Sequence, residues 1–119
     1  MLQSCIKIFY RMKRKVRLSE KEIEVIKKSA EEIFGKGTKV YLFGSRVDLK
    51  KRGGDIDLYI RPKFRNNLLE KRIKFLIKLW EELGEQKIDI ILEKNPEREI
   101  EKIALKEGVE LWKRNMKLF

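Results

Sequence analysis

Two aspartates, Asp55 and Asp57, stand one residue apart just before an apolar run. Successive side chains of a β-strand point to opposite faces, so a strand through this segment would place both carboxylates on one face. Neighbouring carboxylates repel each other, and a divalent cation between them relieves that repulsion. The pair is therefore expected to bind a cation that prefers oxygen ligands, Mg²⁺ above all, with Mn²⁺ as the alternative.

A third aspartate, Asp89, lies later in the chain between Ile88 and Ile90. Its side chain should face away from those two neighbours, and it joins Asp55 and Asp57 if the two strands pair side by side. Three carboxylates around two metal ions suit phosphoryl or nucleotidyl transfer. The ions hold the attacking and leaving oxygens, and the third carboxylate accepts the proton of the incoming hydroxyl.

A Gly-Ser pair, Gly44 and Ser45, follows an apolar segment that reads as a strand. Glycine allows the backbone to turn so that N–H groups face a phosphate, and the serine hydroxyl adds a donor. Arg46 and further basic residues follow, which suits the charge of a triphosphate or of departing pyrophosphate. We therefore predict that the nucleotide-binding residues are Gly44, Ser45 and Arg46.

Each of these features has an ordinary structural explanation when it is taken alone. A Gly-Ser pair is a common turn, and surface strands often carry acids on their outer face. Asp89 by itself would be a solvated strand residue. The prediction depends on the combination, in which the turn ends one strand, the paired aspartates begin the next, and the third acid lies in a later strand.

Hydrophobic spacing predicts a first helix over residues 19–34. Ser19 is its expected N-cap, and Glu22, three residues on, completes a capping box. Runs of β-branched and aromatic residues predict strands at 39–43 and 56–60. The Gly-Ser pair thus ends the first strand, and the aspartate pair begins the second.

A second helix is expected over residues 67–83, and a third strand at 87–92 contains Asp89. The apolar stripe of that helix, which should face the core, consists of Leu69, Ile73, Leu76, Trp80 and Leu83.

A third helix is expected to begin at Asn95-Pro96, with the asparagine as cap, and to end at Gly108. Its inward-facing residues should be Ile100, Ile103 and Ala104. Residues 109–112 form a short strand or coil. This order of elements predicts an α/β sandwich in which helices cover a small sheet.

Composition limits the chemistry further. The 119 residues include no His, which excludes histidine ligands and histidine acid–base catalysis. The single cysteine, Cys5, cannot form an intramolecular disulfide and fits a reducing, cytoplasmic compartment. No apolar run approaches the length of a membrane helix, so no membrane association is expected. The length fits one domain.

The chain carries a net charge of +11, from 30 Lys and Arg against 19 Asp and Glu. Such a charge attracts nucleotides, nucleic acid or an acidic protein. A heat-adapted surface rich in Lys and Glu explains much of the excess equally well. Residues 1–18 are basic and contain no acid, so they form a basic N-terminal extension, either an arm that contacts RNA or a partner, or a solvated leader.

The segments FGSR, GDIDLYI and KIDIIL together resemble the minimal nucleotidyltransferase (MNT) family of the DNA polymerase beta superfamily, and within it the MntA-like antitoxins. The family signature is a strand, Gly-Ser, about ten residues, Asp-x-Asp and a later strand aspartate. The likeness covers roughly residues 19–113, and it implies that residues 19–119 are a nucleotidyltransferase domain. It implies a polymerase beta palm-like α/β fold, with helices packed on a mixed sheet.

The resemblance also implies the ligands and the residues that bind them. ATP is the expected substrate, with Mg²⁺ as cofactor; Gly44 and Ser45 bind its phosphates, and the three aspartates form the metal site. Two positions depart from the family pattern. Asp48 adds a negative charge to a loop that is usually basic, and Gly54 stands where a serine often precedes the first aspartate.

The resemblance further implies a biological role. Small members of the family are paired with a HEPN-domain toxin and transfer AMP to one of its tyrosines, which makes them the antitoxin of a toxin–antitoxin pair. Two alternatives remain from the residues themselves. One is the same chemistry on the hydroxyl of a small molecule. The other is a non-catalytic basic module that binds RNA or protein, and weak nucleic-acid contact through the basic surface fits either role.

Overall fold

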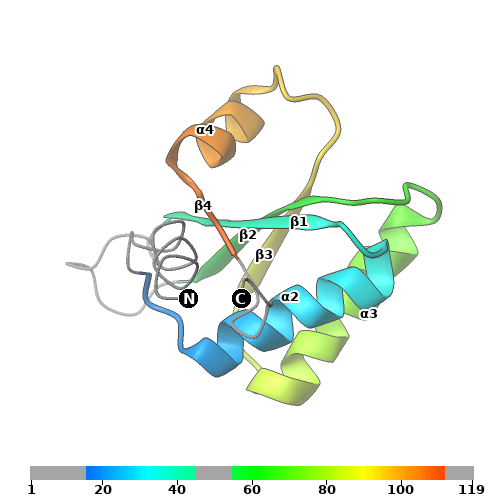
Figure 1. Cartoon of the computed structure of the whole chain (residues 1–119), viewed down its shortest axis with the longest axis vertical. Coiled ribbons are helices and arrows are strands. Elements are labelled where there is room, and N and C mark those ends of the chain that lie inside the picture. Colours follow the sequence, from blue (N-terminus) through cyan, green and yellow to red (C-terminus); the bar gives the residue numbers. More distant parts are fainter. Residues whose placement is uncertain (1–15, 45–54, 112–119) are drawn as a thin grey trace, which may run out of the picture.

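The computed structural model describes residues 16–44 and 55–111 (Figure 1). Its helices are α2 (Glu20–Phe34), α3 (Leu68–Leu83) and α4 (Glu99–Glu107). Its strands are β1 (Lys39–Phe43), β2 (Ile56–Arg61), β3 (Ile88–Leu92) and β4 (Val109–Glu110). Residues 1–15 of the expected basic extension, together with Ser45 and Arg46, lie outside the described residues.

The four strands form one mixed sheet in the order β3-β2-β1-β4. β1 runs antiparallel to both β2 and β4, whereas β2 and β3 are parallel. Helices α2 and α3 lie against one face of this sheet and α4 lies against the other (Figure 1). The α/β fold with helices packed on a mixed sheet is therefore confirmed.

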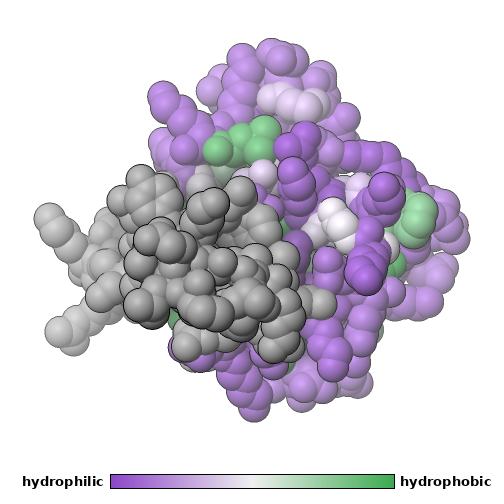
Figure 2. Space-filling view, in the orientation of Figure 1, coloured by the Kyte–Doolittle hydropathy of each residue, from purple (hydrophilic) through white to green (hydrophobic). Residues whose placement is uncertain are grey.

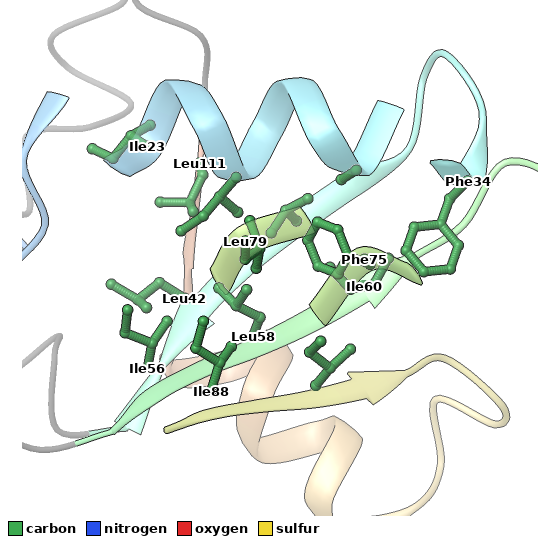
Figure 3. Packing of buried hydrophobic residues seen from close by; sticks show 14 residues of the cluster. Ile23, Phe34, Leu42, Ile56, Leu58, Ile60, Phe75, Leu79, Ile88 and Leu111 are labelled. Atoms are coloured by element: carbon green, nitrogen blue, oxygen red, sulfur yellow. The ribbon is translucent and has the colours of Figure 1, made fainter. Parts of the chain in front are cut away.

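The main core lies between the sheet and the α2–α3 layer (Figure 3). The strand β2 contributes Ile56, Leu58 and Ile60, which alternate along the strand and are fully buried. From the helices, Phe34 and Phe75 meet edge to face, with ring centroids 5.6 Å apart. Each fully buried side chain of this size contributes roughly 1.5–3 kcal/mol. Since β2 is anchored through these residues, its alternate residues face the α4 side of the sheet.

The predicted capping box at the start of α2 is confirmed. The Ser19 hydroxyl accepts a hydrogen bond from the Glu22 N–H at 3.1 Å, and the Glu22 carboxylate accepts one from the Ser19 N–H at 2.8 Å. Because all the partners lie within four residues of one another, the sequence alone was enough to predict it.

The predicted inward face of α3 is wrong in part. Leu69 is 72% exposed and Ile73 is 49% exposed, whereas Phe75 and Leu79 are fully buried. The helix carries apolar residues around more than one face, so two helical stripes were available. The stripe that contains Phe75 is buried because Phe75 packs against Phe34 of α2.

The predicted start and inward face of α4 are also wrong. The helix begins at Glu99 with Arg98 as its N-cap. Asn95 instead forms a turn, in which its side-chain oxygen accepts from the Glu97 N–H at 3.0 Å and its carbonyl accepts from the Arg98 N–H at 2.9 Å. The residues of α4 that are buried against the sheet are Glu101 and Ala104, while Ile100 and Ile103 are exposed.

No helix within the described ranges is long and apolar enough to span a bilayer.

Candidate active site

Gly44, Asp57 and Asp89 meet at one end of the sheet face that α4 covers. In the β1–β2 ladder Phe43 lies opposite Asp57, so Gly44 follows directly at the end of β1. In the parallel β2–β3 ladder Asp57 is the register partner of Asp89. Partners in register project to the same face of a sheet, so the two carboxylates lie side by side.

The carboxyl groups of Asp57 and Asp89 form a hydrogen bond that alters the titration of Asp57. Partial burial, then the hydrogen bond and negative charge of Asp89, then the charge of Asp55, raise the pKa of Asp57 from 3.8 to about 6; Lys87 opposes this shift. The fold thus holds two carboxyl groups close together, which makes the ionised form of Asp57 less favourable. A hard divalent cation would offset that cost, and carboxylate oxygens are the ligands it prefers.

Asp55 immediately precedes β2, is half-buried and faces a lysine. Its carboxylate lies 3.5 Å from the ammonium group of Lys87. Lys87 and Asp89 are two residues apart, so the alternation of side chains along a strand places them on the same face. This spacing was a sequence signal for a cation beside the acids, and the sequence analysis missed it. Within residues 16–44 and 55–111, no three Asp, Glu, Cys or His side chains are grouped closely enough to hold a metal ion.

Gly44 approaches the Asp57 carboxylate more closely than any other residue type allows. Its φ of 82° lies in the left-handed region that favours glycine. A Cβ atom built on Gly44 would overlap the carboxylate oxygen of Asp57. The turn that begins the predicted phosphate-binding loop is therefore packed directly on the aspartate pair.

Replacing Gly44 with alanine should lower the free energy of unfolding by about 2–4 kcal/mol, the sum of left-handed strain and the clash with Asp57. Urea denaturation measures the loss. Gly84→Ala is the matched control, because Gly84 has a φ of 90° and nothing within 4 Å of its added Cβ. The control should lose only about 1 kcal/mol. Equal losses at the two positions would show that close packing on Asp57 is unimportant.

A buried hydrogen-bond cluster holds α4 on the sheet beside the aspartates. The fully buried Glu101 carboxylate accepts from the Tyr59 hydroxyl at 2.7 Å and from Arg98 Nε at 2.7 Å. It also accepts from the backbone N–H groups of Lys94 at 3.1 Å and Asn95 at 3.0 Å. Burial opposes ionisation, but these hydrogen bonds outweigh it and lower the pKa of Glu101 to about 2.

Tyr59, two residues after Asp57, shares its face of β2, so this cluster supports the strand that carries the aspartate. Sequence analysis did not identify Glu101, because a glutamate in a charged helix gives no signal of burial. Ser45 and Arg46 were predicted to bind the nucleotide, but they lie outside the described residues. The structure thus brings Gly44, Asp57 and Asp89 together, with Asp55 adjacent.

Comparison with known proteins agrees with this geometry. Residues 21–117 match the model of the family described as polymerase beta, nucleotidyltransferase. This range covers most of the chain, including the Gly-Ser turn and all three aspartates. No curated protein matches the chain. Because a family model matches well over half of the sequence, the chain belongs to the polymerase beta nucleotidyltransferase family.

Proposed function

We propose that this protein transfers AMP from ATP to a hydroxyl group of a partner protein. Membership of a nucleotidyltransferase family supports the reaction type. The observation that supports the site best is the pairing of Asp57 with Asp89, which keeps two carboxyl groups in contact and raises the pKa of Asp57 to about 6. The repulsion between these two groups would bring no benefit to a purely structural role. A site for a divalent cation, by contrast, needs carboxylates that are grouped together.

The proposed metal ligands are the carboxylate oxygens of Asp55, Asp57 and Asp89. Their chemistry fits Mg²⁺, with Mn²⁺ as the alternative. When bound, such ions supply charge neutralisation and Lewis-acid activation at the α-phosphate. Movement of Asp55 away from Lys87, 3.5 Å from it in this structure, would complete the set of three.

The remaining residues of the site have distinct proposed roles. Gly44, Ser45 and Arg46 bind the β- and γ-phosphates, since the loop that they begin starts in contact with Asp57. Asp89 accepts the proton of the acceptor hydroxyl. The oxygen of that hydroxyl then forms a bond to the α-phosphorus, the bond to the bridging oxygen breaks, and pyrophosphate leaves with the electron pair.

We propose a tyrosine of a HEPN-domain toxin as the acceptor, which would make this protein the antitoxin of the pair. The resemblance to minimal nucleotidyltransferases supports this assignment. The transferred AMP adds a bulky anion, and a negative group at an RNA-binding surface would repel RNA phosphates. The reaction would therefore inactivate a ribonuclease without degrading it.

Incubation of the protein with α-labelled ATP, Mg²⁺ and a HEPN-domain toxin tests the proposal. We expect the toxin to gain the mass of one AMP at a tyrosine, and EDTA to abolish that gain. The Glu97→Gln variant changes an exposed acid outside the site and should transfer AMP as the wild-type protein does. Toxin neutralisation that persists without Mg²⁺ and without any mass gain would contradict the proposal and favour a non-catalytic binding module.

A further inference from the structure

A groove of about 490 Å³ lies beside β3, the edge strand that carries Asp89. Its α3 wall is formed by Leu68, Leu69 and Arg72, and its other wall by Lys94 and Arg98 from the segment before α4. Ile91 of β3 contributes to its floor. The groove thus lies at the open edge of the sheet, on the strand that carries Asp89.

The polar part of the groove is strongly basic. Arg72, Lys94 and Arg98 contribute three cations, and no acidic residue is among the described residues that line it. Arg72 donates through Nε to the Ile90 carbonyl at 3.1 Å, and Arg98 donates through Nε to Glu101 at 2.7 Å. A guanidinium has five N–H donors, so both arginines retain donors that would suit the two oxygens of a carboxylate.

The apolar part of the groove is unusually exposed. Leu69 has 72% of its surface exposed, the largest fraction among the exposed large hydrophobic residues of the described chain. In the view of Figure 2 the described surface is mostly hydrophilic, and hydrophobic residues appear only in small separate areas. Leu69 therefore offers an exposed apolar contact in the same groove as three cations.

The wall that contains Lys94 and Arg98 is held in a fixed conformation. Glu101 binds the backbone N–H groups of Lys94 and Asn95, as well as Arg98 itself. Just before it, Glu93 is paired with both Arg61 and Arg65. A wall that is already ordered loses little conformational entropy when a ligand binds, which favours recognition at this position.

We propose that this groove is the docking site for an acidic segment of the acceptor protein. The segment would place an apolar side chain against Leu69 and carboxylates beside Arg72, Lys94 and Arg98. Charge complementarity favours an acidic occupant over a second copy of this chain, because two chains with a net charge of +11 would repel each other. One part of the inference rests on the proposed function, namely that a segment held along β3 would bring an acceptor hydroxyl near Asp89.

Selection from a displayed library of short random peptides tests the groove with no partner chosen in advance. We expect the wild-type protein to select peptides in which Asp or Glu flanks a large apolar residue. Binding of a synthetic selected peptide, measured by fluorescence anisotropy, should weaken about tenfold in both Leu69→Ser and Lys94→Glu. Affinity should also fall as salt is added, because the contacts are largely between charges.

Two matched variants control for changes in apolar surface and in net charge. Ile77→Ser removes an apolar side chain of the same helix that is 48% exposed and does not line the groove. Lys28→Glu reverses an exposed charge on α2, away from the groove. Both controls should bind the peptide with the affinity of the wild-type protein.

Several outcomes would overturn the docking proposal. They are selection of peptides without acidic residues, equal affinity in all four variants, a monomer–dimer equilibrium that Leu69→Ser abolishes, and tighter groove-dependent binding of an RNA oligonucleotide. Failure of the proposed function has a different signature. If the selected peptide binds in the groove but the toxin gains no AMP, the docking site stands and the transfer reaction is wrong.

Discussion

Asp57→Asn is expected to reduce the proposed AMP transfer by about a thousandfold and, at the same time, to stabilise the metal-free protein at about pH 7.5. Activity should fall because a neutral amide is a poor ligand for Mg²⁺ and cannot replace the lost charge. Stability should rise because the asparagine cannot ionise beside Asp89 and Asp55, whose charges help to raise the pKa of Asp57 to about 6. Labelled-ATP assays and thermal denaturation measure the two effects.

The sign of the stability effect depends on pH. The pKa of Asp57 is 3.8 in an unfolded chain and about 6 in the folded protein. The folded state therefore binds the proton more tightly, and the stability that this provides is lost as pH rises through about 6. The gain from Asp57→Asn should be clear at about pH 7.5 and absent at about pH 4.

Added Mg²⁺ should reverse the order of stability. The ion is expected to bind the folded wild-type protein at the proposed site and to raise its melting temperature, whereas Asp57→Asn should respond little. Glu97→Gln, which changes an exposed acid elsewhere, should behave as wild type in every comparison. A variant that retains transfer activity, or that is less stable than wild type at neutral pH, would show that Asp57 is not a metal ligand under electrostatic strain.

Glu101→Ala is expected to give the largest loss of stability of any single substitution discussed above, about 3–5 kcal/mol. The carboxylate is fully buried and accepts four hydrogen bonds, from Tyr59, Arg98 and two backbone N–H groups. Alanine would leave the buried Tyr59 hydroxyl without its acceptor and would open a cavity under α4. Urea denaturation at neutral pH measures the effect.

Glu99→Ala is the matched control, because Glu99 is an exposed acid in the same first turn of α4. It should cost no more than about 0.5 kcal/mol through the helix dipole. Because the pKa of Glu101 is lowered to about 2, its contribution is fully present above about pH 4.5 and is lost as pH falls through about 2. Similar losses in the two alanine variants would contradict the role of Glu101 as the anchor of α4.

Several features of this protein depend only on neighbours in the chain. The capping box at Ser19 and Glu22 joins residues three apart, and the alternation of β2 follows from strand geometry alone. For the same reason the sequence predicted which face Asp57 and Asp89 would occupy, each relative to its own strand. The motif itself was sufficient to indicate a nucleotidyltransferase, and the family match agrees.

Other features depend on contacts that reach beyond immediate neighbours in the chain. Asn95-Pro96 suits both a helix N-cap and a turn, because in either case the asparagine oxygen accepts a nearby N–H. The turn forms here because Glu101 binds the backbone N–H groups of Lys94 and Asn95. Likewise, Phe34 decides which apolar stripe of α3 is buried.

The sequence by itself determined the types of element, the face of each strand and the kind of chemistry that its acids suit. Only the tertiary structure decided that β3 pairs with β2 in the register that joins Asp89 to Asp57. It also decided that Lys87 faces Asp55, and that Leu69 is exposed beside a basic groove. The physical reason is that hydrogen bonds between neighbours are specified locally, whereas burial and strand pairing are chosen by the packing energy of the whole fold.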